Sequence, residues 1–260
     1  MNPIRRYEKI MEVMLHQRDV TVAELSKKLQ VTGKTIREDL TKLEEQGLIH
    51  RVHGGAVLAQ SNQLGILPTH ESKPKFLEEK VEIAQMALAH IHPHDIIALD
   101  GGSTTLEIAK LLDNIELTVI TNDVHIISQL AQKDQIRLVV PGGSRVRNML
   151  IGPEAVTYIH NLNIQKTFIS ATAIHPEHGL SIYTGDLIPY KQALITTARQ
   201  VYTVIDHHKF GSTALRTFAA LDQIDLILTD GGLTAENAEL FIKTGTKLEI
   251  GLKTNLNLKS

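Results

Sequence analysis

The amino-acid sequence predicts an α/β domain, with a mainly parallel sheet and helices on both of its faces, preceded by a small winged helix-turn-helix. Short amphipathic helices joined by a tight turn, and followed by a hairpin pattern, occupy residues 1–58. Residues 59–75 then have the composition of a linker, rich in Ser, Asn, Gly and Pro. From residue 76 to 260, strands alternate with amphipathic helices, which predicts the parallel sheet.

The first two helices are expected to support a third. A helix over residues 4–17 has Ile10, Val13 and Met14 on one face, and we interpret it as structural. The second helix is shorter and is followed by a stretch that is long enough only for a tight turn. Its apolar positions are Val22, Ala23, Leu25 and Leu29.

The third helix, over residues 31–47, has one apolar face and one polar face. Ile36, Leu40 and Leu43 recur on it at helical spacing, and the hydroxyl of Thr32 can cap its start. In a helix-turn-helix, the second helix of the pair enters the major groove with its N-terminal turn against the base edges. The polar face of this helix is therefore expected to read DNA.

After residue 47 the pattern changes to alternation, which predicts a small β-hairpin over residues 48–58 with Gly54 and Gly55 at its turn. Such a hairpin is a wing that lays Arg51 and His53 along the phosphates. The candidate DNA-binding residues of the helix and the wing are Thr32, Lys34, Thr35, Arg37, Lys42, Arg51 and His53.

The alternative is a plain structural helix pair, because any amphipathic pair shares this pattern. The N-terminal position, the turn length and the basic wing together favour DNA binding. Residues 1–58 contain 10 Lys and Arg against 8 Asp and Glu, a net charge of +2, whereas the rest of the chain carries −4. Phosphate contacts need only a local basic face. Because the charge is weak, we expect a homodimer or homotetramer that binds repeated half-sites of double-stranded DNA.

Composition excludes several classes of protein. With 42% hydrophobic and 22% charged residues, the chain has no apolar run of membrane-spanning length, so no membrane partner is expected. The basic N-terminus precedes no apolar stretch, which argues against a signal peptide and for a cytoplasmic location. The absence of cysteine excludes disulfides, thiol nucleophiles and cysteine-ligated zinc.

In the C-terminal region, helices and short apolar strands follow one another. Helices are expected over residues 76–91, 103–112, 123–131, 152–162 and 188–200. Strands are expected over residues 95–100, 117–122, 136–140, 166–171, 201–206, 226–230 and 246–250. In parallel sheets ligands bind beyond the carboxyl ends of the strands, so the loops at those ends are the candidate site.

The most informative of these loops runs from Asp100 to Thr105, between a strand and a helix. Its two glycines let the backbone approach a ligand, its hydroxyls can point inward, and the helix start offers free N–H groups. This combination predicts an anion site, best suited to phosphate. The alternative is an ordinary glycine-rich turn with a serine cap. The loop matches neither the P-loop nor the dinucleotide-binding fingerprint.

Polar, glycine-rich segments follow three other strands and are expected to converge on the same crevice. Lys209, with Arg145 or Arg147, could bind the charge of a phosphorylated ligand. The candidate effector-binding residues are Asp100, Gly101, Gly102, Ser103, Thr104, Thr105, Thr121, Asn122, Gly142, Gly143, Arg145, Arg147, Asp206 and Lys209.

These motifs resemble the DeoR family of bacterial transcriptional regulators along essentially the whole chain. The resemblance rests on TVAELSKKLQVTGKTIREDLTKLEEQGLIHRVHGGA, followed in order by LDGGSTT, TND, PGG, DHHKFG and LTD. It implies a sensor domain of the ribose-5-phosphate isomerase-like fold, which binds a phosphorylated sugar or polyol and releases a repressor from the operator of a carbohydrate operon. It also implies that the loop at Asp100–Thr105 holds the phosphate and that the other strand-end residues surround the sugar.

The chain departs from the family pattern at several positions. An acidic residue followed by Gly-Ile is replaced by Thr172-Ala173-Ile174, and Asn-Glu is replaced by Thr184-Gly185. The usual Ser or Thr before the late lysine is His208. These departures concern the identity of the effector and its binding mode rather than the fold.

An enzyme is the rival class: a sugar-phosphate isomerase carrying a DNA-binding module. Isomerisation needs a carboxylate base, and the resemblance would put that base at Thr172, which cannot accept a proton from carbon at neutral pH. Asp100, Asp186 and Asp206 remain as candidates for that base. Because the expected position of the base is occupied by a threonine, we predict a binding protein with no catalytic residues and no cofactor.

A metal site is the remaining alternative, because the chain has 13 histidines. His90, His92 and His94 alternate across the end of a helix, and His207 and His208 are adjacent. Neither group has the spacing that zinc commonly uses, so no metal is expected.

Overall fold

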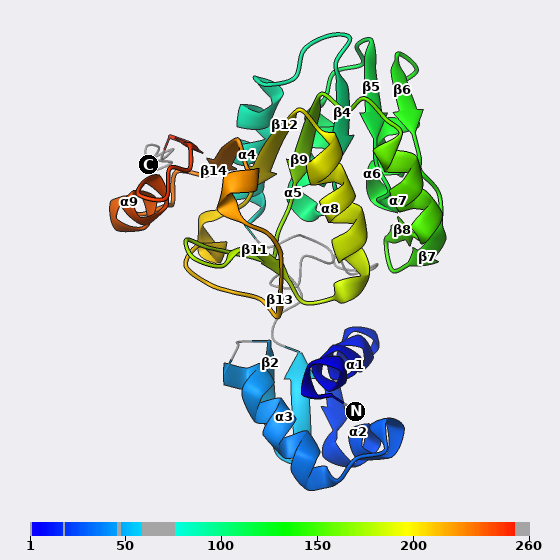
Figure 1. The fold of residues 1–260 in the computed structure, drawn as a ribbon, viewed down its shortest axis with the longest axis vertical. Coiled ribbons are helices and arrows are strands. Elements are labelled where there is room, and N and C mark those ends of the chain that lie inside the picture. Colours follow the sequence, from blue (N-terminus) through cyan, green and yellow to red (C-terminus); the bar gives the residue numbers. More distant parts are fainter. Residues whose placement is uncertain (1, 18, 46–47, 59–75, 253–260) are drawn as a thin grey trace, which may run out of the picture.

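The computed structural model describes residues 2–17, 19–45, 48–58 and 76–252, and shows a small N-terminal part and a larger C-terminal part (Figure 1). We use these two names for the described residues up to 58 and from 76 on. The predicted linker, residues 59–75, lies outside the described residues. Among the described residues, no helix is long and apolar enough to cross a membrane.

The N-terminal part contains three helices and a three-stranded antiparallel sheet. The helices are α1 (Pro3–His16), α2 (Val22–Leu29) and α3 (Gly33–Glu45). The strands are β1 (Asp19–Thr21), β2 (Ile49–Val52) and β3 (Gly55–Leu58), in the order β1-β3-β2. The predicted wing is therefore confirmed as β2 and β3, and β1, which the sequence did not reveal, extends it to a third strand.

A compact apolar core joins these elements. Ile10 and Met14 of α1, Leu25 of α2, and Ile36 and Leu40 of α3 are all 1% exposed or less. The predicted apolar faces of the first and third helices are thus buried, which confirms them.

One position of the predicted apolar face of α2 is wrong. Ala23 is exposed, because α2 packs through Leu25 and Leu29. A capping box starts the helix: the side chain of Thr21 accepts from the N–H of Glu24, whose carboxylate accepts from the N–H of Thr21.

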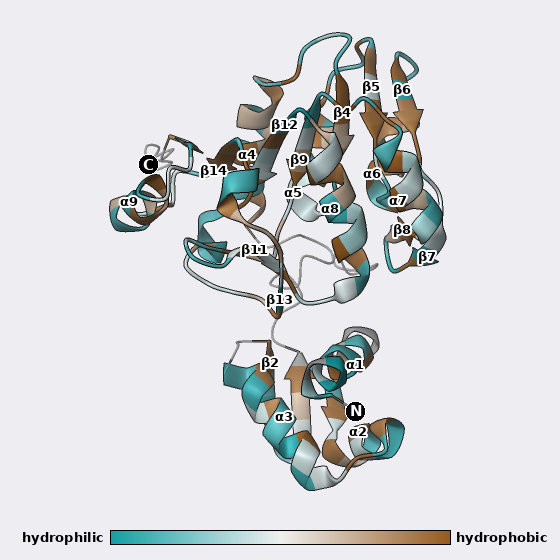
Figure 2. Cartoon of the chain, in the orientation of Figure 1, coloured by the Kyte–Doolittle hydropathy of each residue, from teal (hydrophilic) through white to brown (hydrophobic). Residues whose placement is uncertain are grey.

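The C-terminal part is built on a seven-stranded sheet in which all pairs are parallel. Its strands are β4 (Ile96–Leu99), β5 (Leu117–Ile120), β6 (Ile136–Val139), β9 (Lys166–Ile169), β12 (Gln200–Val204), β14 (Leu226–Thr229) and β15 (Leu248–Ile250). Their order is β15-β14-β12-β9-β4-β5-β6. The predicted strands are confirmed, and Figure 2 shows β4, β5 and β6 coloured mainly as hydrophobic segments.

Helices cover both faces of the sheet, as predicted. One face carries α4 (Leu77–Leu88), α5 (Ser103–Leu111) and α6 (Val124–Leu130). The other carries α7 (Pro153–His160), α8 (Ile188–Thr197) and α9 (Ala235–Ile242), the last of which the sequence did not reveal. Ile97 and Leu99 of β4 pack on the first face and Ala98 on the second, so the strand is apolar at successive positions because both its faces are buried.

Two small antiparallel sheets, not predicted, lie beyond the main sheet. A hairpin is formed by β7 (Ser144–Val146) and β8 (Met149–Ile151), and a three-stranded sheet by β10 (Ala173–His175), β11 (Gly179–Ile182) and β13 (Arg216–Ala219). Short 3-10 helices η2 (Gly185–Leu187), η3 (His207–Lys209) and η4 (Leu221–Gln223) complete this part.

The two parts contact each other beside β11 and β13. Arg216 forms an ion pair of 2.7 Å with Glu8 of α1. Tyr183, which follows β11, is 6% exposed and packs in the apolar core of the N-terminal part, next to Ala214 and Leu215. An aromatic side chain and an ion pair therefore connect the N-terminal part to the C-terminal part.

Candidate functional site

The predicted reading face of α3 is open to solvent at its N-terminal turns. Lys34 and Arg37 are exposed, while the opposite face is buried. The hydroxyl of Thr32 accepts a hydrogen bond of 3.2 Å from the N–H of Thr35, so it caps the helix start as predicted. Lys42 lies near the other end of α3, where it pairs with Glu45 at 3.1 Å.

The wing is fastened to α3 through Arg51. Its backbone N–H donates to Glu44 at 2.8 Å, and its guanidinium donates to the hydroxyl of Thr41 at 3.0 Å. His53, at the turn of the hairpin, is exposed. The seven predicted DNA-binding residues thus belong to one exposed helix face and the hairpin held against it.

A buried ion pair that the sequence did not reveal holds α3 in place. Arg6 of α1 donates two hydrogen bonds to the carboxylate of Asp39, one of them at 2.7 Å, and Asp39 is 2% exposed. The hydrogen bond to Asp39 raises the pKa of Arg6. This contact fixes the orientation of the reading helix on α1.

Six of the predicted effector residues are polar yet buried at the carboxyl ends of β4, β5 and β12. Each is 1% exposed or less. They are Asp100, Thr104, Thr105, Thr121, Asn122 and Asp206. Because buried polar groups are costly unless they have partners, this concentration at one edge of the sheet makes that edge the candidate binding site.

The glycine loop allows close backbone approach at the start of α5. A β-carbon on Gly102 would lie 2.4 Å from the Oγ of Ser170, and one on Gly101 would lie 2.2 Å from the sulfur of Met149. Gly102 is the N-cap of α5, and no side chain among the described residues caps the helix start with a hydrogen bond. The positive end of the helix is therefore available to an anion, with Ser103 partly exposed beside it.

Asp100 is held by a network that the sequence did not reveal. Lys191 of α8 donates to Asp100 and, at 2.9 Å, to the carbonyl of Ser170. The N–H and hydroxyl of Ser170 also donate to Asp100, at 3.0 and 3.2 Å. A single lysine within an apolar helix was the signal that could have identified Lys191.

A second charged group lies at the end of β12. Lys209 is 3.6 Å from Asp206 and donates to the carbonyl of Ala171 at 3.0 Å. Lys80 of α4 is 2% exposed, and mainly burial, with a contribution from the charge of Lys209, lowers its pKa to about 8. Lys80 is thus a further cation near this candidate site, one that sequence reasoning missed.

The β7–β8 hairpin covers the loop after β5. Asn122 donates to the carbonyl of Leu150 at 2.9 Å, and Asn148 donates to Asp123 at 2.6 Å. Gly142 and Gly143, which precede the hairpin, have φ of +88° and +111°. These glycines supply the left-handed backbone that lets the hairpin fold back.

Arg145 and Arg147 are also on this hairpin. The sequence predicted that one of them would lie with Lys209 at the effector site. Both arginines line a cavity of about 580 Å³ with residues of α1 and α2. The structure therefore brings these two arginines together with the N-terminal part rather than with Lys209.

The positions that depart from the family pattern lie around the same site. Thr172 is 5% exposed, and its N–H donates to the carbonyl of Ser181. Thr184 is 8% exposed and borders a small cavity with Gly101 and Met149. His208 stacks on Phe76 with ring centroids 3.7 Å apart.

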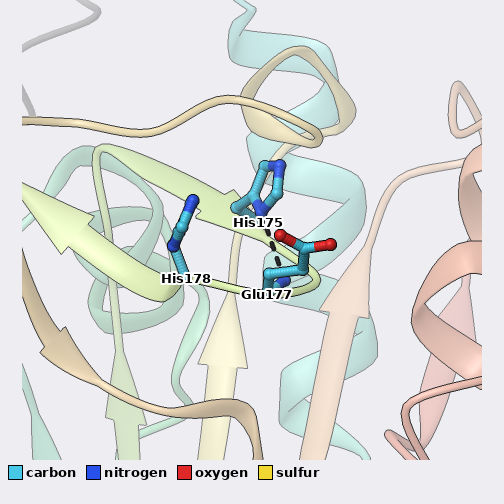
Figure 3. Close-up of side chains that lie close together, drawn as sticks. All are labelled: His175, Glu177 and His178. Carbon is cyan, nitrogen blue, oxygen red and sulfur yellow. Dashed lines mark hydrogen bonds between the residues drawn. The ribbon is translucent and has the colours of Figure 1, made fainter.

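The histidines considered for metal binding contact separate carboxylates: His90 contacts Glu249, His92 contacts Asp95, and His207 contacts Asp230. A different group, at the turn between β10 and β11, could hold an ion (Figure 3). Its ligand atoms, from His175, Glu177 and His178, lie within 4.8 Å of one another. The first of these rings already accepts from a backbone N–H, at 3.1 Å, and the expectation of no metal stays a prediction.

Comparison with known proteins identifies both parts of the chain. One family model, described as the DeoR C terminal sensor domain, matches residues 75–231, and another, the DeoR-like helix-turn-helix domain, matches residues 6–62. The transcriptional repressor GlcR of Bacillus subtilis (strain 168) is 31% identical over 242 residues, 92% of this chain and 93% of that protein. The transcriptional regulator IolR of the same organism is 32% identical over 238 residues, 90% and 93% of the two proteins.

Among solved structures, ribose 5-phosphate isomerase A from Methanocaldococcus jannaschii is 16% identical, covering 50% of this chain and 52% of that chain, with a TM-score of 0.37. The relatives at sequence level are named as regulators and repressors with a helix-turn-helix domain, so the chain is a DNA-binding transcriptional regulator and not an enzyme. The chain belongs to the DeoR family.

Proposed function

We propose that the protein is a repressor of a carbohydrate uptake or catabolism operon, released from its operator by a phosphorylated sugar or polyol. Residues 1–58 would form the domain that binds the operator, and residues 76–260 the domain that binds the effector. Residues 59–75 would link these two domains. The observation that carries the proposal is the uncapped N-terminus of α5 behind Gly101 and Gly102, beside buried polar side chains. The repressor GlcR, similar along nearly the whole chain, supports the sign of regulation.

The operator would be bound by α3 in the major groove. Lys34, Thr35 and Arg37, on the first turns of the helix, would approach base edges, because these turns enter the groove in this class of domain. Arg51 and His53 of the wing would contact phosphates, and so would Thr32 and Lys42 at the ends of the helix. The burial of Ile36, Leu40 and Leu43 supports this orientation, since it leaves the opposite face free.

The effector phosphate would bind the N–H groups and hydroxyls of the loop from Gly101 to Thr105. Asp100, Thr121, Asn122, Asp206 and Lys209 would contact the sugar or polyol, and Gly142 and Gly143 would shape the covering loop. The buried state of most of these side chains supports this role, because hydroxyl groups of a ligand would satisfy them.

Effector binding would reach the DNA-binding domain through the β7–β8 hairpin and β11. Met149 lies against Gly101, so a phosphate at the glycine loop would press on the hairpin, whose arginines border α1 and α2. An effector can shift the arrangement of the domains only by its different affinity for the two arrangements. A homodimer or homotetramer would convert this shift into a changed spacing of two reading helices.

The proposal is tested with the full chain and duplex DNA from its own genomic neighbourhood. We expect specific gel shifts at low salt and their loss when a phosphorylated hexose, pentose or polyol from a panel is added. The same compound is expected to raise the melting temperature with concentration, as a ligand of the folded state does. Operator binding that no phosphorylated compound changes would contradict the effector class.

A further inference from the structure

A cavity lies between the N-terminal and C-terminal parts, apart from the glycine loop. It measures about 580 Å³, within the range of sites for small ligands. Lys9, Glu12 and Val13 of α1, and Lys28 and Leu29 of α2, form one wall. Arg145, Val146 and Arg147 of the β7–β8 hairpin, and Asp186 of η2, form the other.

The polar lining of the cavity is mainly cationic. Four side chains are positive and two are negative. In the part of the chain that the structure describes, none of the four cations has a carboxylate within the 4.0 Å of an ion pair; they are Lys9, Lys28, Arg145 and Arg147. These four positive charges outnumber the two carboxylates of the lining and repel one another, and a bound anion would relieve this repulsion.

Arg147 is the cation that is built most firmly into the wall. Its φ of +57° is unusual for a residue with a side chain, and its carbonyl accepts a hydrogen bond of 2.8 Å from the Nε of Arg145. Burial lowers the pKa of Arg147, although Asp186 and Glu12 oppose this effect. Because arginine keeps its proton, the guanidinium stays charged where hydration is reduced and lacks a close counter-ion.

We propose that this cavity binds a small phosphorylated anion with at least two negative charges, which bridges the DNA-binding and sensor domains. Arginine forms paired hydrogen bonds to phosphate oxygens, and lysine supplies point charge. Lys28 and Lys9 approach from the first domain, and Arg145 and Arg147 from the second. The ligand thus binds only when the domains are close, and it fixes their arrangement.

This site is distinct from the proposed effector cleft. The glycine loop and Lys209 do not line the cavity, although Val146, Arg147 and Asp186 also border a smaller, neighbouring cavity that includes Gly101. The regulator then has two anion sites that both contact the β7–β8 hairpin. Ligands at the two sites influence each other through that hairpin, and the coupling is reciprocal.

Isothermal titration of the full chain with inorganic pyrophosphate at low salt tests the proposal. Arg147→Ala and Lys28→Ala each remove one cation from opposite walls, and each is expected to weaken binding at this site about tenfold. Arg137→Ala, at the exposed position of β6, removes the same charge elsewhere and is expected to leave the affinity unchanged. Ser103→Ala, in the glycine loop, is expected to leave pyrophosphate bound at the cavity.

Four outcomes would overturn the proposal: no saturable binding, equal losses in Arg147→Ala and Arg137→Ala, complete loss in Ser103→Ala, or normal binding in Lys28→Ala. The third outcome would assign the anion to the effector cleft alone, and the fourth to the sensor domain alone. Thermal unfolding of each variant checks its fold. If Arg147→Ala does not fold, Arg147→Gln, which keeps the aliphatic stem, replaces it in the same comparison.

Discussion

At the scale of single residues, two arginines near α3 are expected to have different roles. Arg37 is exposed on the first turns of the helix, and no carboxylate of the described residues forms an ion pair with it. Arg51, in contrast, is hydrogen-bonded to Thr41 and Glu44 at the wing. A base contact carries sequence information, and a phosphate contact supplies affinity that depends on salt.

Arg37→Ala is therefore expected to weaken operator binding by about 1–3 kcal/mol and to relax specificity at one base position. Arg51→Ala is expected to weaken binding to all sequences and to reduce the salt slope by about 1. Fluorescence anisotropy over a range of salt concentrations, on operator and unrelated duplexes, separates the two effects. Unchanged affinity in both variants would contradict the proposed docking.

Lys191 supports a second prediction, because it neutralises a carboxylate that is fully buried. Lys191→Ala leaves Asp100 without its cation and is expected to lower the free energy of unfolding by about 3–5 kcal/mol. Lys243→Ala breaks an exposed pair with Glu239 and serves as the control, with little expected effect. Urea denaturation measures both. A similar small loss in the two variants would mean that the Asp100 network is not an essential part of the fold.

Lys80 predicts a dependence of stability on pH. Its pKa falls from 10.5 to about 8 on folding, so below pH 8 both states are protonated and the folded state bears the whole cost of the buried charge. Between pH 8 and 10.5 the folded state loses its proton first, and this cost disappears. The unfolding free energy of the wild type, relative to Lys80→Met, is expected to rise by up to about 3 kcal/mol over this window. A difference that stays constant with pH would show that Lys80 is not desolvated.

At the scale of elements, the parallel sheet and the wing hairpin could be predicted, whereas the other small antiparallel strands could not. The central strands are short apolar runs because both sheet faces are buried, and such runs are visible in a sequence. The three residues of strand β7, Ser-Arg-Val, all belong to the exposed class and show no apolar pattern, so only the pairing with β8 makes this segment a strand. The same holds for β1, β10 and β13, whose partners lie far away in the chain or across a turn.

The candidate effector site could likewise be predicted only in part. Its glycines and hydroxyls follow predicted strands, so they could be assigned to one edge of the sheet. Lys191 and Lys80 could not, because each is a lone lysine within a helix and only the packing of that helix brings it to the edge. The grouping of Arg145 and Arg147 with α1 depends on the fold of the β7–β8 hairpin, for which the sequence carries no pattern.

The β4–α5 loop gives a prediction at this scale. Gly102→Ala would place a β-carbon 2.4 Å from the Oγ of Ser170, which donates to Asp100, so the loop must move away from the helix start. We expect effector affinity to fall at least tenfold while operator binding is kept. Gly245→Ala, which has φ of +84° and no atom within 4 Å, controls for a loss of stability without a change at the site. Equal effector binding in both variants would contradict the phosphate role of the loop.

At the scale of the whole molecule, the contact between the domains decides whether effector binding is transmitted. The ion pair between Glu8 and Arg216 is partly exposed and is expected to contribute less than about 1 kcal/mol. Tyr183 is the stronger contact, because it is 6% exposed and its ring packs among the core residues of the N-terminal part. Burial also raises the pKa of its hydroxyl to about 12, so the group stays neutral at physiological pH.

Tyr183→Ala should therefore uncouple the two domains without removing either site. Coupling between sites in regulators is typically worth about 1–3 kcal/mol, a 5- to 150-fold change in affinity. We expect the effector to lose most of its influence on operator affinity in this variant, while both ligands still bind separately. Tyr158→Ala, which removes a tyrosine that is 45% exposed on α7, is the matched control and should respond like the wild type. If effector still releases the operator normally from Tyr183→Ala, the signal does not pass through β11, and the β7–β8 hairpin must carry it alone.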